Sequence, residues 1–184
     1  MKLTEHYNNL FSEFVNKLKF SNVEVDNQLF SKADNRYGIT LVIVPPEIVK
    51  QNIQQFLSEL KIIEPEQYYY RNSDIHITVM SVISCYQNIS LDKIKIEEYL
   101  EVIKKSLINI KNFSIDFNGI TATQSAIMVQ GFPSNNNLNI LRDNLRNEFA
   151  STNLEQSLDK RYAIQTAHST VVRFRNEIQH KEKF

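Results

Sequence analysis

The chain has 184 residues and carries 21 basic and 21 acidic side chains, so its net charge is zero. A neutral chain is not a dedicated nucleic-acid coat, which needs a large excess of cations, although it can hold a local cationic site. Its three glycines lie too far apart for the glycine-rich loops that cradle dinucleotides and triphosphates, and its single cysteine allows neither an internal disulfide nor a cysteine-based zinc cluster.

The start of the chain has neither an apolar signal segment nor a small-residue cleavage site. No apolar run approaches the length of a membrane span. We therefore expect a cytoplasmic protein with no membrane partner.

Hydrophobic periodicity and turn residues define the first half of the chain. In chain order, the expected elements are an amphipathic helix (3–19), a polar linker (20–35), a strand (37–44), a helix (47–60), a short tyrosine-rich strand (68–70) and a strand rich in β-branched residues (75–83).

The second half contains the same kinds of element. We expect a helix (93–109), two strands (113–123 and 125–131), an asparagine-rich loop, a helix (137–152) and one or more strands within 162–174. Because strands and helices do not alternate strictly, the pattern predicts an α+β fold with antiparallel sheets.

One pattern occurs twice. The segment ITLVIVP (39–45) is followed by a helix and then by His-Ile-Thr (76–78), and AIMVQGFP (126–133) is followed by a helix and then by His-Ser-Thr (168–170). Each half is therefore a strand, a proline, a helix and a strand that carries His-x-Thr. The repetition predicts a duplicated unit, with two lobes related by a pseudo-twofold axis.

The His-x-Thr pairs are the candidate catalytic residues. Residues i and i+2 of a strand project to the same face, so His76 and Thr78 project together, as do His168 and Thr170. One imidazole can take a proton from an attacking oxygen while the other gives a proton to a leaving oxygen. With an ordinary pKa of about 6.5, both protonation forms are accessible at neutral pH. The hydroxyls can donate to phosphate oxygens.

The remaining histidines are interpreted differently. His6 lies in the N-terminal helix and His180 in a charged tail, and both are expected to be solvated. No third His or Cys is spaced to join His76 and His168 around an ion, so the sequence predicts no metal site.

With these motifs, the chain resembles the two-histidine (2H) phosphoesterase superfamily, which includes bacterial RNA 2′,3′-cyclic phosphodiesterases, also called 2′-5′ RNA ligases. The spacing from His168 to Arg173 fits the H-x-T-x-x-R pattern of that branch. Other stretches, such as SDIHITV and AHSTVVRF, resemble a bacterial subgroup of which some members are labelled mutarotase.

The resemblance implies a bilobal α+β fold with two pseudo-symmetric lobes, whose antiparallel sheets are flanked by helices. The expected organisation is an N-terminal helix and linker (1–35), then one domain (36–184) with lobes at about 36–110 and 111–175. The resemblance also implies chemistry without a metal or other cofactor. No obligate protein partner is evident.

Two further residues are candidates for substrate binding. Arg173 lies five residues after His168, so an ideal strand would turn it to the opposite face, but a bulge or the strand end could bring it back. It is either a phosphate contact or a surface ion pair. Tyr70 either stacks on a base or packs within its strand.

The favoured hypothesis is a metal-independent phosphodiesterase that acts on a nucleotide or RNA end, at a 2′,3′-cyclic phosphate or a 2′-5′ linkage. His168 is assigned as the base and His76 as the acid, although the pseudo-symmetry makes the roles interchangeable. Two alternatives are a sugar mutarotase that uses the same acid–base pair and a non-catalytic nucleotide- or RNA-binding module.

Overall fold

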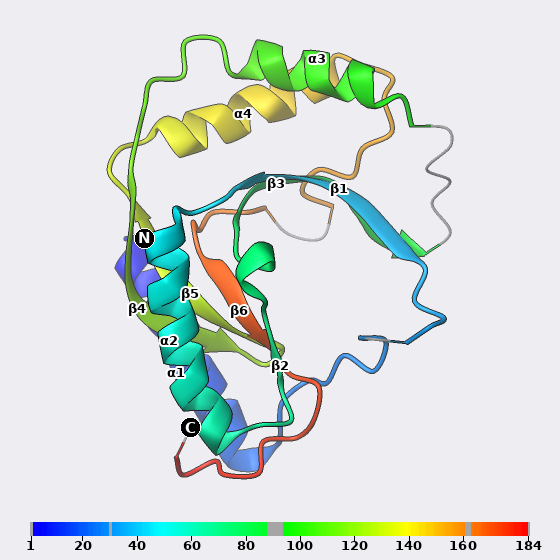
Figure 1. The fold of residues 1–184 in the computed structure, drawn as a ribbon. Coiled ribbons are helices and arrows are strands. Elements are labelled where there is room, and N and C mark those ends of the chain that lie inside the picture. The colour runs from blue at the N-terminus through cyan, green and yellow to red at the C-terminus, as the bar shows by residue number, and fades with distance from the viewer. Residues whose placement is uncertain (1, 30, 88–93, 161–162, 184) are drawn as a thin grey trace.

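A computed structural model describes residues 2–29, 31–87, 94–160 and 163–183. These residues form an α+β fold with four α-helices and two antiparallel sheets (Figure 1), which confirms the expected fold class. In chain order the elements are α1 (Leu3–Phe20), β1 (Arg36–Ile43), α2 (Glu47–Ile63), β2 (Tyr68–Tyr69), a 3₁₀ turn (Asn72–Asp74), β3 (Ile77–Gln87), α3 (Ile96–Ser106), β4 (Ile115–Thr123), β5 (Ala126–Pro133), α4 (Asn137–Ala150) and β6 (Ser169–Arg173).

The elements match the sequence expectations closely, with shifts at their ends. The helix expected over 93–109 is the shorter α3, and residue 93 lies outside the described residues. The last strand begins only at Ser169, and Tyr162, the start of the range expected for it, also lies outside them. No helix in the described part of the chain is both long and apolar enough to cross a membrane.

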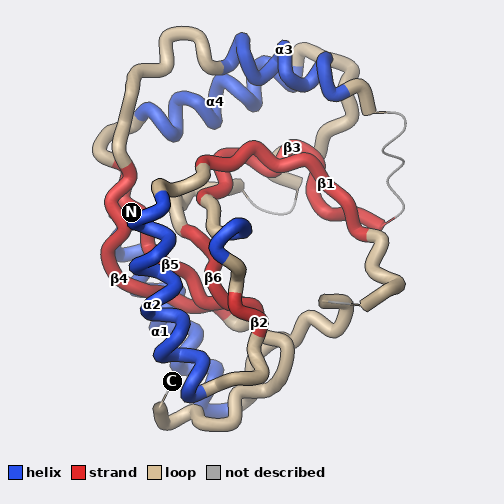
Figure 2. The backbone as a smooth tube through the Cα atoms, viewed as in Figure 1, coloured by secondary structure: helices blue, strands red, loops and turns tan. Residues whose placement is uncertain are grey.

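The two sheets differ in size. β1 pairs only with β3, whereas the larger sheet has the order β2-β6-β5-β4 (Figure 2). β6 is therefore an inner strand with hydrogen-bonded neighbours on both sides, and its Val171 and Val172 are fully buried.

Two hydrophobic clusters fill the interior, and each one contains a helix that does not pack on the strand directly before it in the chain. α2 comes directly after β1, yet its Ile53 and Leu57 pack in the cluster of the larger sheet. α4 comes directly after β5, yet its Leu141 and Leu145 pack in the cluster of β3 and α3. Each half of the chain thus contributes a helix to the core that contains the other half's sheet, and this ties the halves together.

α1 is part of the core of the larger sheet. Its apolar stripe buries Tyr7, Phe14 and Leu18, and the helix packs against β4. The Thr121 hydroxyl of β4 donates to the backbone carbonyl of Tyr7 at 2.9 Å. The packing brings His6, near the start of α1, to the same cavity as His168.

Candidate functional site

Both His-x-Thr segments show the alternation that strand geometry predicts. Ile77 and Val79 are each 2% exposed, while His76 and Thr78, which alternate with them, are only partly buried. In the second segment Ser169 is fully buried, and its neighbours His168 and Thr170 are partly buried. In each motif the histidine and the threonine therefore share the more open face of the strand, and the residue between them points into the core.

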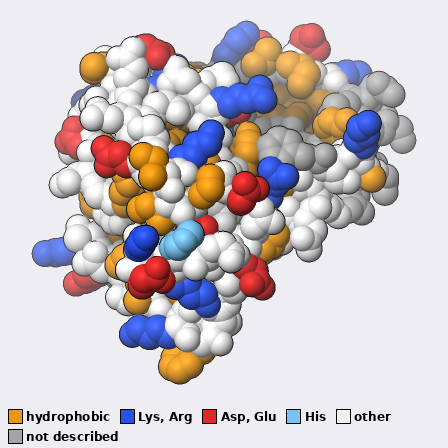
Figure 3. Space-filling model, turned by 60° about the horizontal axis from the view of Figure 1, so that its bottom comes forward, with side chains coloured by type: hydrophobic (Ala, Val, Ile, Leu, Met, Phe, Trp, Pro, Cys, Tyr) orange, Lys and Arg blue, Asp and Glu red, His pale blue; other side chains and the backbone are white. Residues whose placement is uncertain are grey.

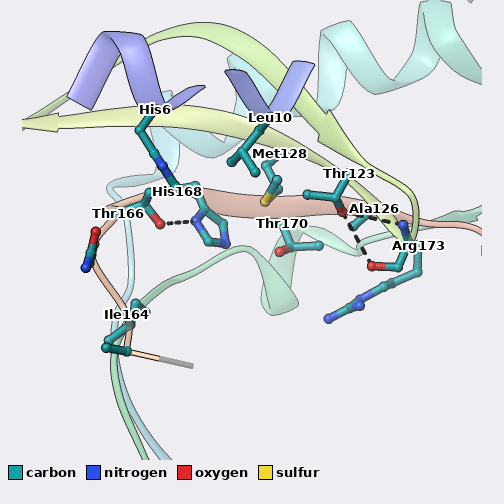
Figure 4. A pocket seen from close by; sticks show the side chains of 13 residues that line it. His6, Leu10, Thr123, Ala126, Met128, Ile164, Thr166, His168, Thr170 and Arg173 are labelled. Atoms are coloured by element: carbon teal, nitrogen blue, oxygen red, sulfur yellow. Dashed lines mark hydrogen bonds between the residues drawn. The ribbon is translucent and has the colours of Figure 1, made fainter. Parts of the chain in front are cut away.

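A bulge in β6 brings Arg173 to the face of His168 and Thr170. Met128 of β5 pairs with Thr170, and its neighbour Ile127 pairs with Val172. One step along β5 therefore corresponds to two steps along β6, so β6 has one extra residue at this point. Figure 4 shows the three side chains on the same side of the β6 ribbon. Of the two alternatives for Arg173, the geometry favours a place in the candidate site over a separate surface position.

These side chains line a cavity of about 540 Å³. Its polar lining comes from α1, from the end of β4 and the turn after it, and from β6 with the segment that leads into it: His6, Thr123, Ser125, Gln165, Thr166, His168, Thr170 and Arg173. His76, Thr78 and Tyr70 are not among the described residues that line this cavity. The structure thus brings half of the predicted catalytic set directly into one cavity.

His168 is held as a neutral imidazole. Its Nδ1 lies 2.6 Å from the Thr166 hydroxyl, which leaves Nε2 as the other nitrogen for chemistry. Burial lowers the pKa of His168 to about 4, and the positive charges of Arg142, Arg173 and His76 act in the same direction. At neutral pH this imidazole is therefore unprotonated, and the expectation that both its forms are accessible there does not hold for this histidine.

His76 is oriented by the backbone. Its Nδ1 lies 2.7 Å from the carbonyl oxygen of Asp74 in the 3₁₀ turn. Because a carbonyl only accepts, Nδ1 must carry the hydrogen, and this fixes the tautomer and leaves Nε2 outward. The charge of His76 is one of the smaller causes of the lowered pKa of His168.

Arg142 joins the two motif segments, and the sequence expectations missed it. Its guanidinium donates to the carbonyl oxygens of Val79 at 2.9 Å, Thr78 at 3.0 Å and Thr166 at 2.7 Å. The side chain is 1% exposed, and burial lowers its pKa to about 10. In the sequence, burial of this arginine could have been predicted from its place on the apolar stripe of α4, between Leu138 and Leu145.

The prediction that His6 is solvated is wrong. Its side chain is partly buried, extends from α1 towards His168 (Figure 4) and lines the same cavity. The positive charge of His6 also contributes to the lowered pKa of His168. In the sequence, the only indication was that His6 lies next to Tyr7, which is on the buried face of α1.

Tyr7 and Gly131 support the segment before β6. The Tyr7 hydroxyl donates to the carbonyl of Gly131 at 3.2 Å and accepts from its N–H at 3.3 Å, and burial raises the pKa of Tyr7. A Cβ at Gly131 would lie 2.0 Å from the carbonyl oxygen of Ala167. Only glycine lets the strand that contains residue 131 approach the backbone beside His168 this closely.

Tyr70 is part of the packing. Its backbone N–H donates to Val171 at 3.0 Å, its ring centroid lies 5.3 Å from that of Tyr68, and it packs against the cluster of the larger sheet. Of the two alternatives for Tyr70, this geometry favours packing within the strand over stacking on a base.

Two comparisons with known proteins found no match for this chain. No protein-family model matches the chain, and no curated protein matches it. The likeness to two-histidine phosphoesterases therefore rests on the motifs and stays a prediction. Within the described residues, no group of three or more His, Cys, Asp or Glu side chains is placed to hold a metal ion.

Proposed function

We propose that the protein is a metal-independent phosphodiesterase that acts on a nucleotide or RNA phosphodiester, either a 2′,3′-cyclic phosphate or a 2′-5′ linkage. The observation that carries the proposal is the face of β6 on which His168, Thr170 and Arg173 line one cavity. An imidazole, a hydroxyl and a guanidinium together suit a phosphate, which needs proton transfer, hydrogen-bond donors and a counter-charge.

His168 acts as the base in this proposal. A base must be unprotonated at the start of the reaction, and burial with nearby positive charges keeps His168 in that form. When its Nδ1–H donates to Thr166, the Nε2 lone pair can take a proton from the attacking water. The water oxygen then forms a bond to phosphorus.

His76 acts as the acid. With Nδ1–H bonded to the Asp74 carbonyl, the protonated ring carries its transferable proton on Nε2. That proton goes to the leaving ribose oxygen as its bond to phosphorus breaks, and the product is a phosphomonoester. His168 ends protonated and His76 neutral, and exchange with solvent restores both rings. Thr78, Thr170 and Arg173 stabilise the charge on the non-bridging oxygens.

The proposed arrangement is the bilobal, pseudo-symmetric one that the family resemblance implies. Two features support it: each motif follows a strand, a proline and a helix in the sequence, and Arg142 bonds to the backbone of both motif segments. On the exposed face in Figure 3, basic and acidic side chains are interspersed, which fits a small local substrate site better than a long nucleic-acid groove.

Arg173 also favours phosphate over the alternative substrates. A sugar ring that opens and closes needs an acid and a base but no fixed cation, and a binding module needs no neutral imidazole held for proton transfer. The cation beside the imidazole is explained by an anionic substrate.

The test is a substrate panel with EDTA present throughout: 2′,3′-cyclic AMP, a 2′-5′-linked diadenylate and an aldose whose anomers are followed by polarimetry. We expect hydrolysis of at least one phosphodiester by wild type and strong loss in His168→Ala. His180→Gln should keep the wild-type activity, because His180 is exposed, pairs with Glu64 and is not among the described residues that line the cavity. Activity on the aldose alone, or hydrolysis that needs added zinc or manganese, would contradict the proposal.

A further inference from the structure

A second polar cavity adjoins the first. It has a volume of about 590 Å³ and shares His6 and residues 163–165 with the cavity of His168. Its other walls come from the start of α1, the end of β5, the loop before α4 and α4 itself, and they include Asn135, Asn139 and Arg142. A ligand seated at His168 can therefore extend past His6 towards the start of α4 without leaving the lined surface.

Of the two arginines that line the second cavity, only one has a carboxylate partner within the described residues. Arg146 is paired with two carboxylates, those of Asp143 and Asp159, and Asp143 also lines the cavity, so Arg146 contributes no net positive charge there. Arg142 donates only to carbonyl oxygens and forms no ion pair within the described residues. Its Nη1 has no hydrogen-bond partner there, although the side chain is 1% exposed. A buried guanidinium that lines a cavity and lacks an anionic partner attracts an anion to that cavity.

The start of α4 adds to this field. The helix has 14 residues, begins at Asn137 and has no acidic residue in its first turn. The N-terminal end of a helix carries a partial positive charge and unpaired N–H groups, which favour phosphate groups. Arg142, which forms no ion pair within the described residues, and the start of α4 thus lie at the same cavity.

From these observations we infer that the second cavity is a subsite for a second phosphate of the substrate, one ribose away from the reacting phosphate. The inference rests on the proposed function, and it narrows the substrate to a nucleotide that also carries a 5′-phosphate or to the end of an oligonucleotide. A bare cyclic mononucleotide would leave this subsite empty.

Binding can be measured without turnover. Calorimetry on the full chain would compare 2′-AMP, with one phosphate, against adenosine 2′,5′-bisphosphate. We expect the bisphosphate to bind wild type about tenfold more tightly. In Asn139→Asp, a carboxylate at the cavity wall should weaken bisphosphate binding by about fivefold and 2′-AMP binding less, as expected for one partly screened like charge. An acidic residue in the first turn suits a helix, so this variant should fold.

The matched control is Asn147→Asp, the same change at an exposed position eight residues later on α4. It should keep the wild-type preference for the bisphosphate. Equal loss in both variants, or a wild type that binds the bisphosphate no more tightly than 2′-AMP, would overturn the subsite. A bisphosphate preference that Asn139→Asp reduces, in a protein that hydrolyses no phosphodiester, would support the subsite and refute the proposed hydrolysis.

Discussion

The two His-x-Thr segments have matching sequences but lie in different surroundings. β3 pairs with one strand only and begins after a 3₁₀ turn, whose carbonyl holds the Nδ1 of His76. β6 lies between two strands, and His168 before it is partly buried beside several positive charges. The difference teaches that a repeated motif can supply two imidazoles with separate roles, because burial and neighbouring charges decide which ring stays neutral.

The largest expected effect is on turnover. His76→Ala and His168→Ala should each lower kcat on a 2′,3′-cyclic nucleotide by roughly 10²–10⁴-fold, because each removes one proton-transfer partner. The double variant should lose much less than the product of the two losses, since both rings serve one transition state. If both single variants keep full activity in steady-state assays, neither motif is catalytic.

The next effect tests the link between the two segments. Arg142→Met should lower the free energy of unfolding in urea by about 3 kcal/mol or more, because three buried carbonyls lose a charged donor. Arg71→Met, at an exposed arginine, should change it by less than about 0.5 kcal/mol. Equal stabilities of the two variants would show that Arg142 does not join the segments.

The neutral state of His168 also makes stability depend on pH. The folded pKa of about 4 lies below the unfolded value of about 6.5, so the unfolded chain binds the proton first as the pH falls. This contribution to stability is present above about pH 6.5 and is lost between there and pH 4. Urea unfolding at pH 7 and pH 5 should show a decrease of about 2 kcal/mol from this group.

A variant isolates the contribution of His168 to that decrease. His168→Gln keeps a polar side chain but cannot take up the proton, so its stability should decrease by about 2 kcal/mol less than that of wild type over the same interval. A decrease of the same size in both proteins would mean that His168 titrates alike in the folded and unfolded states.

Much of this fold could be predicted from sequence because its signals are local. Hydrophobic periodicity located the helices and strands, and strand parity correctly placed His168 and Thr170 together. Parity alone could not place Arg173, because the bulge that turns it depends on pairing with β5. His6 and Arg142 were missed for the same kind of reason, since their surroundings are formed by segments far away in the chain.

The most direct test of the account is the pH dependence of kcat/KM for whichever phosphodiester the panel identifies. If His168 is the base, its protonation should stop the reaction, and the acidic limb of the profile should lie near pH 4. The basic limb should appear as the acid partner loses its proton, with both limbs belonging to the coupled pair. An acidic limb near pH 6.5, or a rate that stays constant from pH 3 to 7, would contradict a partly buried, neutral His168 as the base.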